Sequence, residues 1–146
     1  MVGVAIDMRP LYETQKDRDN EEIVAKFLAE KFNCEYFKLP IAYKADYAFL
    51  RDDKVVGLVE VRCRNVKFSD YETIMLSVHK RMDCLALAQS LDVPVIFAIH
   101  YDDGIYSIDL SKQPDYASVG GRNQVRDWQD IEIVFHYKTG RLQKWS

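Results

Sequence analysis

Residues 44–64 place two acids, Asp46 and Glu60, inside stretches that are otherwise apolar. A carboxylate is rarely buried without a partner, so each of these side chains requires a cation, a hydrogen-bond network or a metal ion. Arg62 follows Glu60 by two positions, which places both side chains on one side of a strand. Two carboxylates together with water molecules suit Mg²⁺ or Mn²⁺, and such an ion can activate a water for phosphodiester hydrolysis.

The register of the hairpin that carries these acids decides whether they can act together. Its strands are expected over 44–51 and 54–62, joined by a turn at 52–53. Because strand side chains alternate between the two faces of a sheet, a tight two-residue turn would put Glu60 on the face opposite to Asp46. If both acids bind one metal ion, this hairpin must therefore contain either a loop of odd length or a bulge.

An acid, a second acid about one hairpin later, then one residue and a cation resembles the pattern of the PD-(D/E)XK nuclease superfamily. The expected order of helix, strands, long helix and strand is similar to the common core of that superfamily. The resemblance covers 17–109, with 110–146 as a C-terminal elaboration of one nuclease-like domain over 1–146. It implies a restriction-endonuclease-like α/β fold, in which a mixed central β-sheet is flanked by helices.

The resemblance also implies roles for individual residues. Asp46 would bridge the metal ion, and Glu60 and the carbonyl of Val61 would complete the protein's ligands. Many members place an acid at the start of the first helix that reaches the metal or its waters, which is here Glu21. The family's usual lysine is replaced by Arg62, which cannot deprotonate and would instead clamp phosphate or stabilise developing charge.

The stretch 62–81 is the most basic part of the chain. Lys80 is expected on the long helix, either oriented toward the site, where it would position water or phosphate, or with its stem on apolar surface and its charge in water. Arg64, Lys67 and Arg81 are expected to contact the phosphates of DNA. Aromatic residues in general are expected in the core rather than as platforms for stacked bases.

Each acid also has a purely structural interpretation. Asp46 could end a strand, Glu60 could pair with Arg62 or Lys44, and Glu21 could be a surface acid favoured by the helix dipole. The chain would then be a catalytically weak or inactive nuclease-fold module that binds nucleic acid or a protein partner. That interpretation is favoured if the first two acids point to opposite faces, or if the arginine pairs with both of them.

The composition of the chain excludes several classes of protein. With 146 residues, 48% of them hydrophobic, and a net charge of −3, it can bury one core and does not resemble a protein that coats nucleic acid. Three dispersed cysteines without CxxC spacing indicate reduced thiols, and neither a signal peptide nor a membrane span is expected. No GxSxG, P-loop or GxGxxG motif supports another α/β enzyme. We expect a protein of the cytoplasm, or of the host cytoplasm if phage-encoded, that acts on DNA alone or as a homodimer.

The remaining elements follow from capping and periodicity. Asp19 is expected to cap a helix that ends at Asn33, and Ser69 to open a long helix over 71–91 through a capping box. The other expected elements are strands over 34–39, 94–101, 105–110 and 131–138, and a long loop over 111–130.

Overall fold

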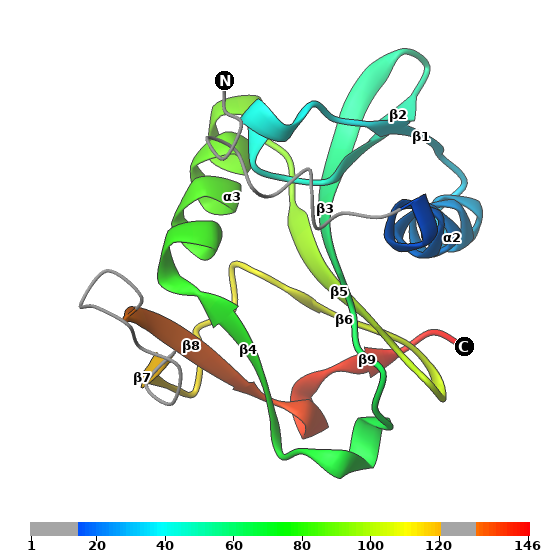
Figure 1. Ribbon diagram of the computed structural model, residues 1–146. Coiled ribbons are helices and arrows are strands. Elements are labelled where there is room, and N and C mark those ends of the chain that lie inside the picture. Colours follow the sequence, from blue (N-terminus) through cyan, green and yellow to red (C-terminus); the bar gives the residue numbers. More distant parts are fainter. Residues whose placement is uncertain (1–14, 121–130) are drawn as a thin grey trace, which may run out of the picture.

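A six-stranded mixed sheet lies between two helices in the computed structural model, which describes residues 15–120 and 131–146 (Figure 1). A second sheet of three strands lies beside the first. In chain order, the elements are α2 (Gln15–Lys31), β1 (Glu35–Lys38), η2 (Ile41–Tyr43), β2 (Tyr47–Arg51), β3 (Lys54–Cys63), η3 (Phe68–Asp70), β4 (Thr73–Ser77), α3 (Val78–Leu91), β5 (Val95–Tyr101), β6 (Gly104–Asp109), β7 (Tyr116–Gly120), β8 (Glu132–Lys138), η6 (Thr139–Arg141) and β9 (Gln143–Lys144).

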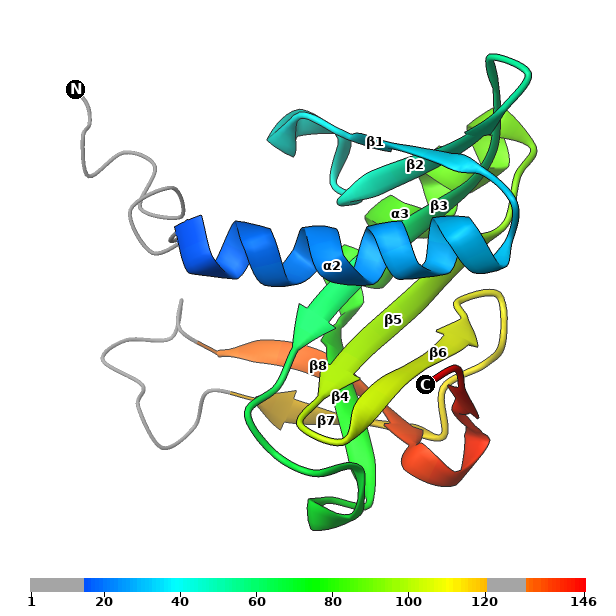
Figure 2. The same cartoon turned by 90° about the vertical axis from the view of Figure 1, so that its right-hand side faces the viewer.

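The large sheet has the strand order β1-β2-β3-β5-β6-β9, in which β3 and β5 are parallel and the other pairs antiparallel. Its two faces are covered by different helices (Figures 1 and 2). On one face, Val24 and Leu28 of α2 pack with Val59 of β3. On the other, Cys84 of α3 packs with Leu58. The central strand is therefore apolar on both sides, as expected of a strand covered twice, and the predicted α/β fold with a mixed central sheet is confirmed.

The β2–β3 hairpin combines a tight turn with a bulge. Its two-residue turn at 52–53 has both residues at positive φ, 54° and 63°, as a type I′ turn requires. Leu50 pairs with Val55, but Phe49 pairs with Gly57, so one extra residue of β3 lies between them. The predicted bulge is present, and it shifts the register by one residue for everything beyond it.

The predicted helix over 71–91 is wrong in its first third. Ile74 and Leu76 alternate as buried residues of strand β4, which pairs antiparallel with β8. Ser77 then ends the strand and caps α3, because its hydroxyl oxygen accepts a hydrogen bond from the Lys80 N–H at 3.3 Å. Cross-strand pairing with a distant segment prevails here over the local capping signal at Ser69.

Other boundaries also differ from expectation. The first helix already includes Asp19, which therefore does not cap it. Strand β7 lies inside the predicted loop over 111–130, and β9 was not predicted. Tyr71, expected in the core, is 58% exposed, and Trp128 lies outside the described residues. The other strands occur close to their expected positions.

The three cysteines are free thiols, as expected for a reduced protein. Within the described ranges, neither α-helix has the length and apolarity that crossing a bilayer requires.

Candidate active site

The β2–β3 hairpin brings the two predicted acids near each other. Tyr47, the first residue of β2, pairs with Val59, and Asp46 directly before it lies against the segment 59–61, which contains Glu60. The Asp46 N–H donates to the Val59 carbonyl at 3.1 Å, and its Oδ2 accepts a hydrogen bond from the Val61 N–H at 2.7 Å. Since the N–H and C=O of one strand residue point toward the same neighbouring strand, the Val61 carbonyl also faces the Asp46 side.

Glu60 is a buried carboxylate, with only 4% of the residue exposed. Its Oε1 has no hydrogen-bond partner among the described residues, and its Oε2 lies 3.5 Å from the Lys80 Nζ. Burial, and then repulsion by Asp46, raises the pKa of Glu60 to about 8, although Lys80 and Arg62 oppose the shift. The side chain is therefore poised to gain a proton or a cation near neutral pH.

Lys80 points from α3 toward this carboxylate, one of the two orientations considered from the sequence. Its Nζ also donates to the Lys44 carbonyl at 3.0 Å, and the Cys84 Sγ lies 3.6 Å from the same oxygen. Lys44 adopts a left-handed conformation with φ of 69° at the end of η2, two residues before Asp46. Lys80 therefore joins the helix to the turn that leads into the first acid. Burial raises the pKa of the Cys84 thiol to about 12, which marks a structural thiol and not a nucleophile.

Replacing Lys80 with methionine should lower the free energy of unfolding by about 1–3 kcal/mol at pH 8. The substitution removes the ammonium group beside Glu60 and the donor to the Lys44 carbonyl. Urea unfolding at pH 8 measures the effect. Lys54→Met, at the exposed start of β3, is the control and should change the value by less than about 0.5 kcal/mol. Equal effects of the two substitutions would contradict the bridging role of Lys80.

Glu21 lies on the other side of Asp46, and a lysine connects the two. The Lys38 Nζ is 3.5 Å from the Glu21 Oε1 and 3.8 Å from the Asp46 Oδ1, and it lies over the Tyr47 ring at 4.9 Å. Lys38 was not among the residues predicted for the site. Its register position, opposite Tyr47 on β1, explains its approach to the acid, and no local sequence signal pointed to it.

Arg62 is half-buried and faces an open cleft beside Glu60. Its guanidinium lies 5.9 Å from the centre of the Phe97 ring. The cleft has a volume of about 600 Å³ and is lined by Lys44, Arg62, Ser77, His79, Lys80, Asp83 and Glu132. Over the described ranges, the ion pairs of Asp46 and Glu60 are formed with lysines and none with Arg62. The pairing that would have favoured a purely structural role for the acids is therefore not found.

The three residues predicted to contact DNA phosphates are not gathered at this cleft. The Arg81 guanidinium donates to the carbonyls of Leu110 and Lys112, at 3.0 and 3.3 Å, so it holds the segment that follows β6. Arg64 and Lys67 lie on the segment between β3 and η3. Their contacts with nucleic acid remain predictions.

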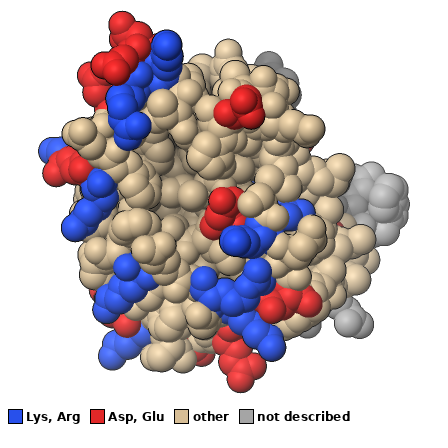
Figure 3. Space-filling model, turned by 180° about the vertical axis from the view of Figure 1, so that it is seen from behind, with Lys and Arg blue, Asp and Glu red and all other residues tan. Residues whose placement is uncertain are grey.

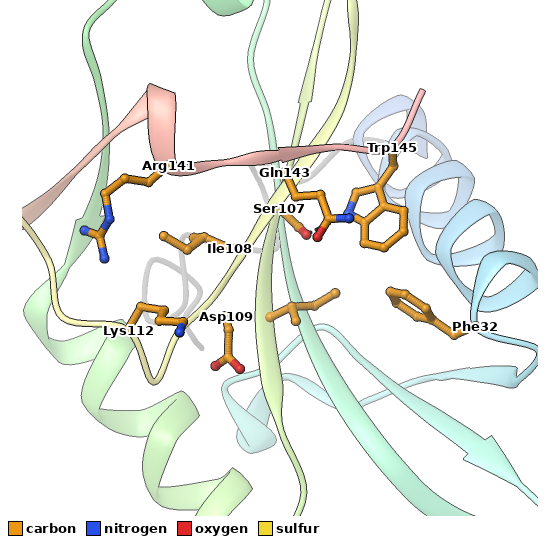
Figure 4. Close-up of a pocket in the computed structure, with 9 residues that line it drawn as sticks. Phe32, Ser107, Ile108, Asp109, Lys112, Arg141, Gln143 and Trp145 are labelled. Atoms are coloured by element: carbon orange, nitrogen blue, oxygen red, sulfur yellow. Dashed lines mark hydrogen bonds between the residues drawn. The ribbon is translucent and has the colours of Figure 1, made fainter.

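A second hollow, of about 510 Å³, lies at the C-terminal end of α2 and contains none of the predicted site residues. In it, the rings of Phe32 and Trp145 pack edge to face with their centroids 5.2 Å apart. The Trp145 indole N–H donates to the Ser107 hydroxyl at 2.8 Å. Arg141 and Lys112 lie at its other end (Figure 4). On the face of the protein opposite to that of Figure 1, basic and acidic side chains are interspersed around a largely uncharged hollow (Figure 3). This face shows no continuous basic surface, in keeping with the small net charge.

The residues around Asp46 and Glu60 fit a hard divalent cation. Two carboxylates of the β2–β3 region, one with a buried oxygen to which no described group hydrogen-bonds, form an oxygen donor set of the kind that Mg²⁺ prefers. No group of three His, Cys, Asp or Glu side chains within 15–120 and 131–146 is arranged to hold a metal ion. The remaining ligands would thus come from the Val61 carbonyl, water and substrate.

The fold and the paired acids define a protein of the PD-(D/E)XK nuclease class. Residues 7–144 match the family model described as "Phage putative PDDEXK endonuclease", and the chain therefore belongs to this family. The resemblance seen in the sequence is confirmed. A comparison with curated protein sequences found no match.

Solved structures show the same fold. Nine chains match, among them Hjc, a Holliday junction resolvase from Archaeoglobus fulgidus. The match has a TM-score of 0.52 at 10% sequence identity, and it covers 66% of this chain and 82% of the resolvase. At this identity the likeness concerns the fold alone.

Proposed function

We propose that this protein is a metal-dependent endonuclease that hydrolyses phosphodiester bonds in DNA. The observation that carries the proposal is the bulged β2–β3 hairpin, at whose end Asp46 hydrogen-bonds to Val59 and Val61 on either side of the buried Glu60. A bulge has a local cost in ladder hydrogen bonds, and its presence beside two carboxylates supports a shared site for them. Family membership supports the same conclusion.

The chain's own residues have distinct roles in this proposal. Asp46, Glu60 and the Val61 carbonyl would hold Mg²⁺ or Mn²⁺, and Glu21 would contact its waters. When bound, the ion supplies a Lewis acid for the phosphate and lowers the pKa of an attacking water. The hydrogen bond from the Val61 N–H fixes one oxygen of Asp46, so that carboxylate is already oriented in the free protein.

Arg62 would act as a fixed positive charge in the cleft. Because a guanidinium stays protonated, it can bind a non-bridging phosphate oxygen throughout the reaction but cannot take a proton from water. Lys80 would neutralise Glu60 until the metal ion binds, and would then position phosphate or water. In this proposal the charge stabilisation of the family's usual lysine is retained, and its capacity to act as a base is not.

A plasmid cleavage assay tests the proposal. The wild-type protein should nick supercoiled DNA with Mg²⁺ or Mn²⁺ and be inactive in EDTA, and Asp46→Asn should abolish nicking in either metal. Linear product would appear later if two copies are needed to cut both strands. No cleavage by wild type, with salt-sensitive DNA binding retained, would instead indicate a non-catalytic module that binds DNA.

A further inference from the structure

Three large apolar side chains are exposed in the short segment that leads from β1 to Asp46. Phe37 is 57% exposed, Ile41 53% and Tyr43 51%. We call these three residues the apolar ledge. Keeping this much apolar surface in water is unfavourable, by roughly 25 cal/mol per Å². Several large exposed apolar side chains within one short segment favour a binding surface.

The ledge leads to the candidate active site. Phe37 pairs with Ala48, and Ala48 belongs to the core cluster that contains Cys84 of α3, so Phe37 lies on the α3 side of the sheet. Tyr43 directly precedes Lys44, whose carbonyl accepts the hydrogen bond from Lys80. The ledge therefore ends beside the residue that Lys80, the partner of Glu60, contacts.

A basic residue directly follows the ledge. Lys38 points to the face opposite to Phe37, toward Glu21 and Asp46, and Lys44 comes directly after Tyr43. Lys44 also lines the cleft together with Arg62 and Lys80. Exposed rings beside a basic groove are the recurring arrangement for single-stranded nucleic acid, because bases stack on the rings while the cations follow the phosphates. A continuous duplex keeps the faces of its bases stacked inside and cannot use such a surface.

We propose that the apolar ledge stacks on unpaired bases beside the bond that is cut, so that the substrate carries single-stranded or branched DNA at that position. This inference rests on the proposed nuclease function. The cations of the adjoining cleft favour nucleic acid over a protein partner, since an apolar protein contact would bury Lys44 without neutralising it.

Fluorescence anisotropy with labelled oligo(dT) and a blunt duplex, in Ca²⁺ or EDTA, measures the effect apart from cleavage. Phe37→Ala and Tyr43→Ala should each weaken oligo(dT) binding about fivefold or more and leave duplex binding unchanged within a factor of two. Tyr43→Trp should preserve binding or strengthen it. Tyr71→Ala is the matched control, because Tyr71 is 58% exposed and follows η3, in a segment separate from the ledge.

The outcomes separate the inference from the function on which it rests. If the ledge variants lose affinity for oligo(dT) but not for the duplex, the inference is supported, and their cleavage of forked DNA should then fall more than their cleavage of duplex plasmid. The inference is overturned if affinity falls equally for both DNAs or does not fall. It is also overturned if sedimentation shows that the ledge variants change their oligomeric state. If wild type cuts no DNA, the proposed function fails, and the anisotropy result still decides whether the ledge binds unpaired bases.

Discussion

Glu60→Gln should lower the rate of metal-dependent DNA cleavage at least about 10³-fold while the protein remains folded. The substitution preserves the shape of a side chain that is 4% exposed, but removes the charge that would bind the metal ion. Asp46 alone would then supply the carboxylate charge between the two strands. Single-turnover cleavage of plasmid DNA at saturating Mg²⁺ measures the loss.

The structure offers a matched control for this substitution. Glu132 lines the cleft together with Arg62 and Lys80, but it is exposed and lies on β8, outside the β2–β3 hairpin. Glu132→Gln should change the rate by less than about threefold, the scale of a surface charge. Circular dichroism and the unfolding transition show whether each variant is folded. A loss below tenfold for folded Glu60→Gln would show that this carboxylate is not a ligand on which catalysis depends.

The stability of the metal-free protein should fall as the pH rises from about 5 to 8, and Glu60→Gln should remove much of this fall. The pKa of Glu60 is raised from 4.5 to about 8, mainly by burial. Between these values the folded protein keeps a proton that the unfolded chain has lost, so folding is progressively less favourable as the pH rises. Each pH unit in the interval contributes about 1.4 kcal/mol, so this one group could account for up to about 5 kcal/mol.

Urea unfolding in EDTA at several pH values measures this dependence. The other titrating groups are common to wild type and Glu60→Gln, so the difference between the two curves isolates Glu60. The variant should gain stability relative to wild type as the pH rises, and the difference should level off above about pH 8. If the unfolding free energies of the two proteins ran parallel over this pH range, burial would not be raising the pKa of Glu60. The loss of stability with rising pH is the expected consequence of keeping a carboxyl group buried in an apolar strand.

The sequence alone was sufficient for the class of protein. The order of Asp46, Glu60 and Arg62 along the chain, within the expected order of elements, indicated the nuclease superfamily. The need to bring the two acids together correctly required either an odd loop or a bulge in the hairpin, and the bulge is present. Local signals also located β1, β3, β5, β6 and β8, the last from its alternating apolar residues and the others from their position between turn residues or proline.

Contacts between segments far apart in the sequence set one strand and the positions of two basic side chains, which local patterns did not predict. The segment 73–77 carries a helical capping signal upstream, yet it forms a strand, because β8 supplies partners from sixty residues away. Lys38 reaches the acids only through its register on β1. Arg81 stands in the basic stretch of the sequence, but packing directs it to the carbonyls after β6.

The sequence by itself therefore determined the fold and selected the candidate residues for a metal site, since both depend on residue type and short spacing. Only the tertiary structure decided that Lys80 and Lys38 accompany Glu60 and Asp46, and that Phe37 and Tyr43 are exposed beside them. The physical reason is that burial and side-chain contacts depend on which distant segments pack together, and a linear pattern does not record those contacts.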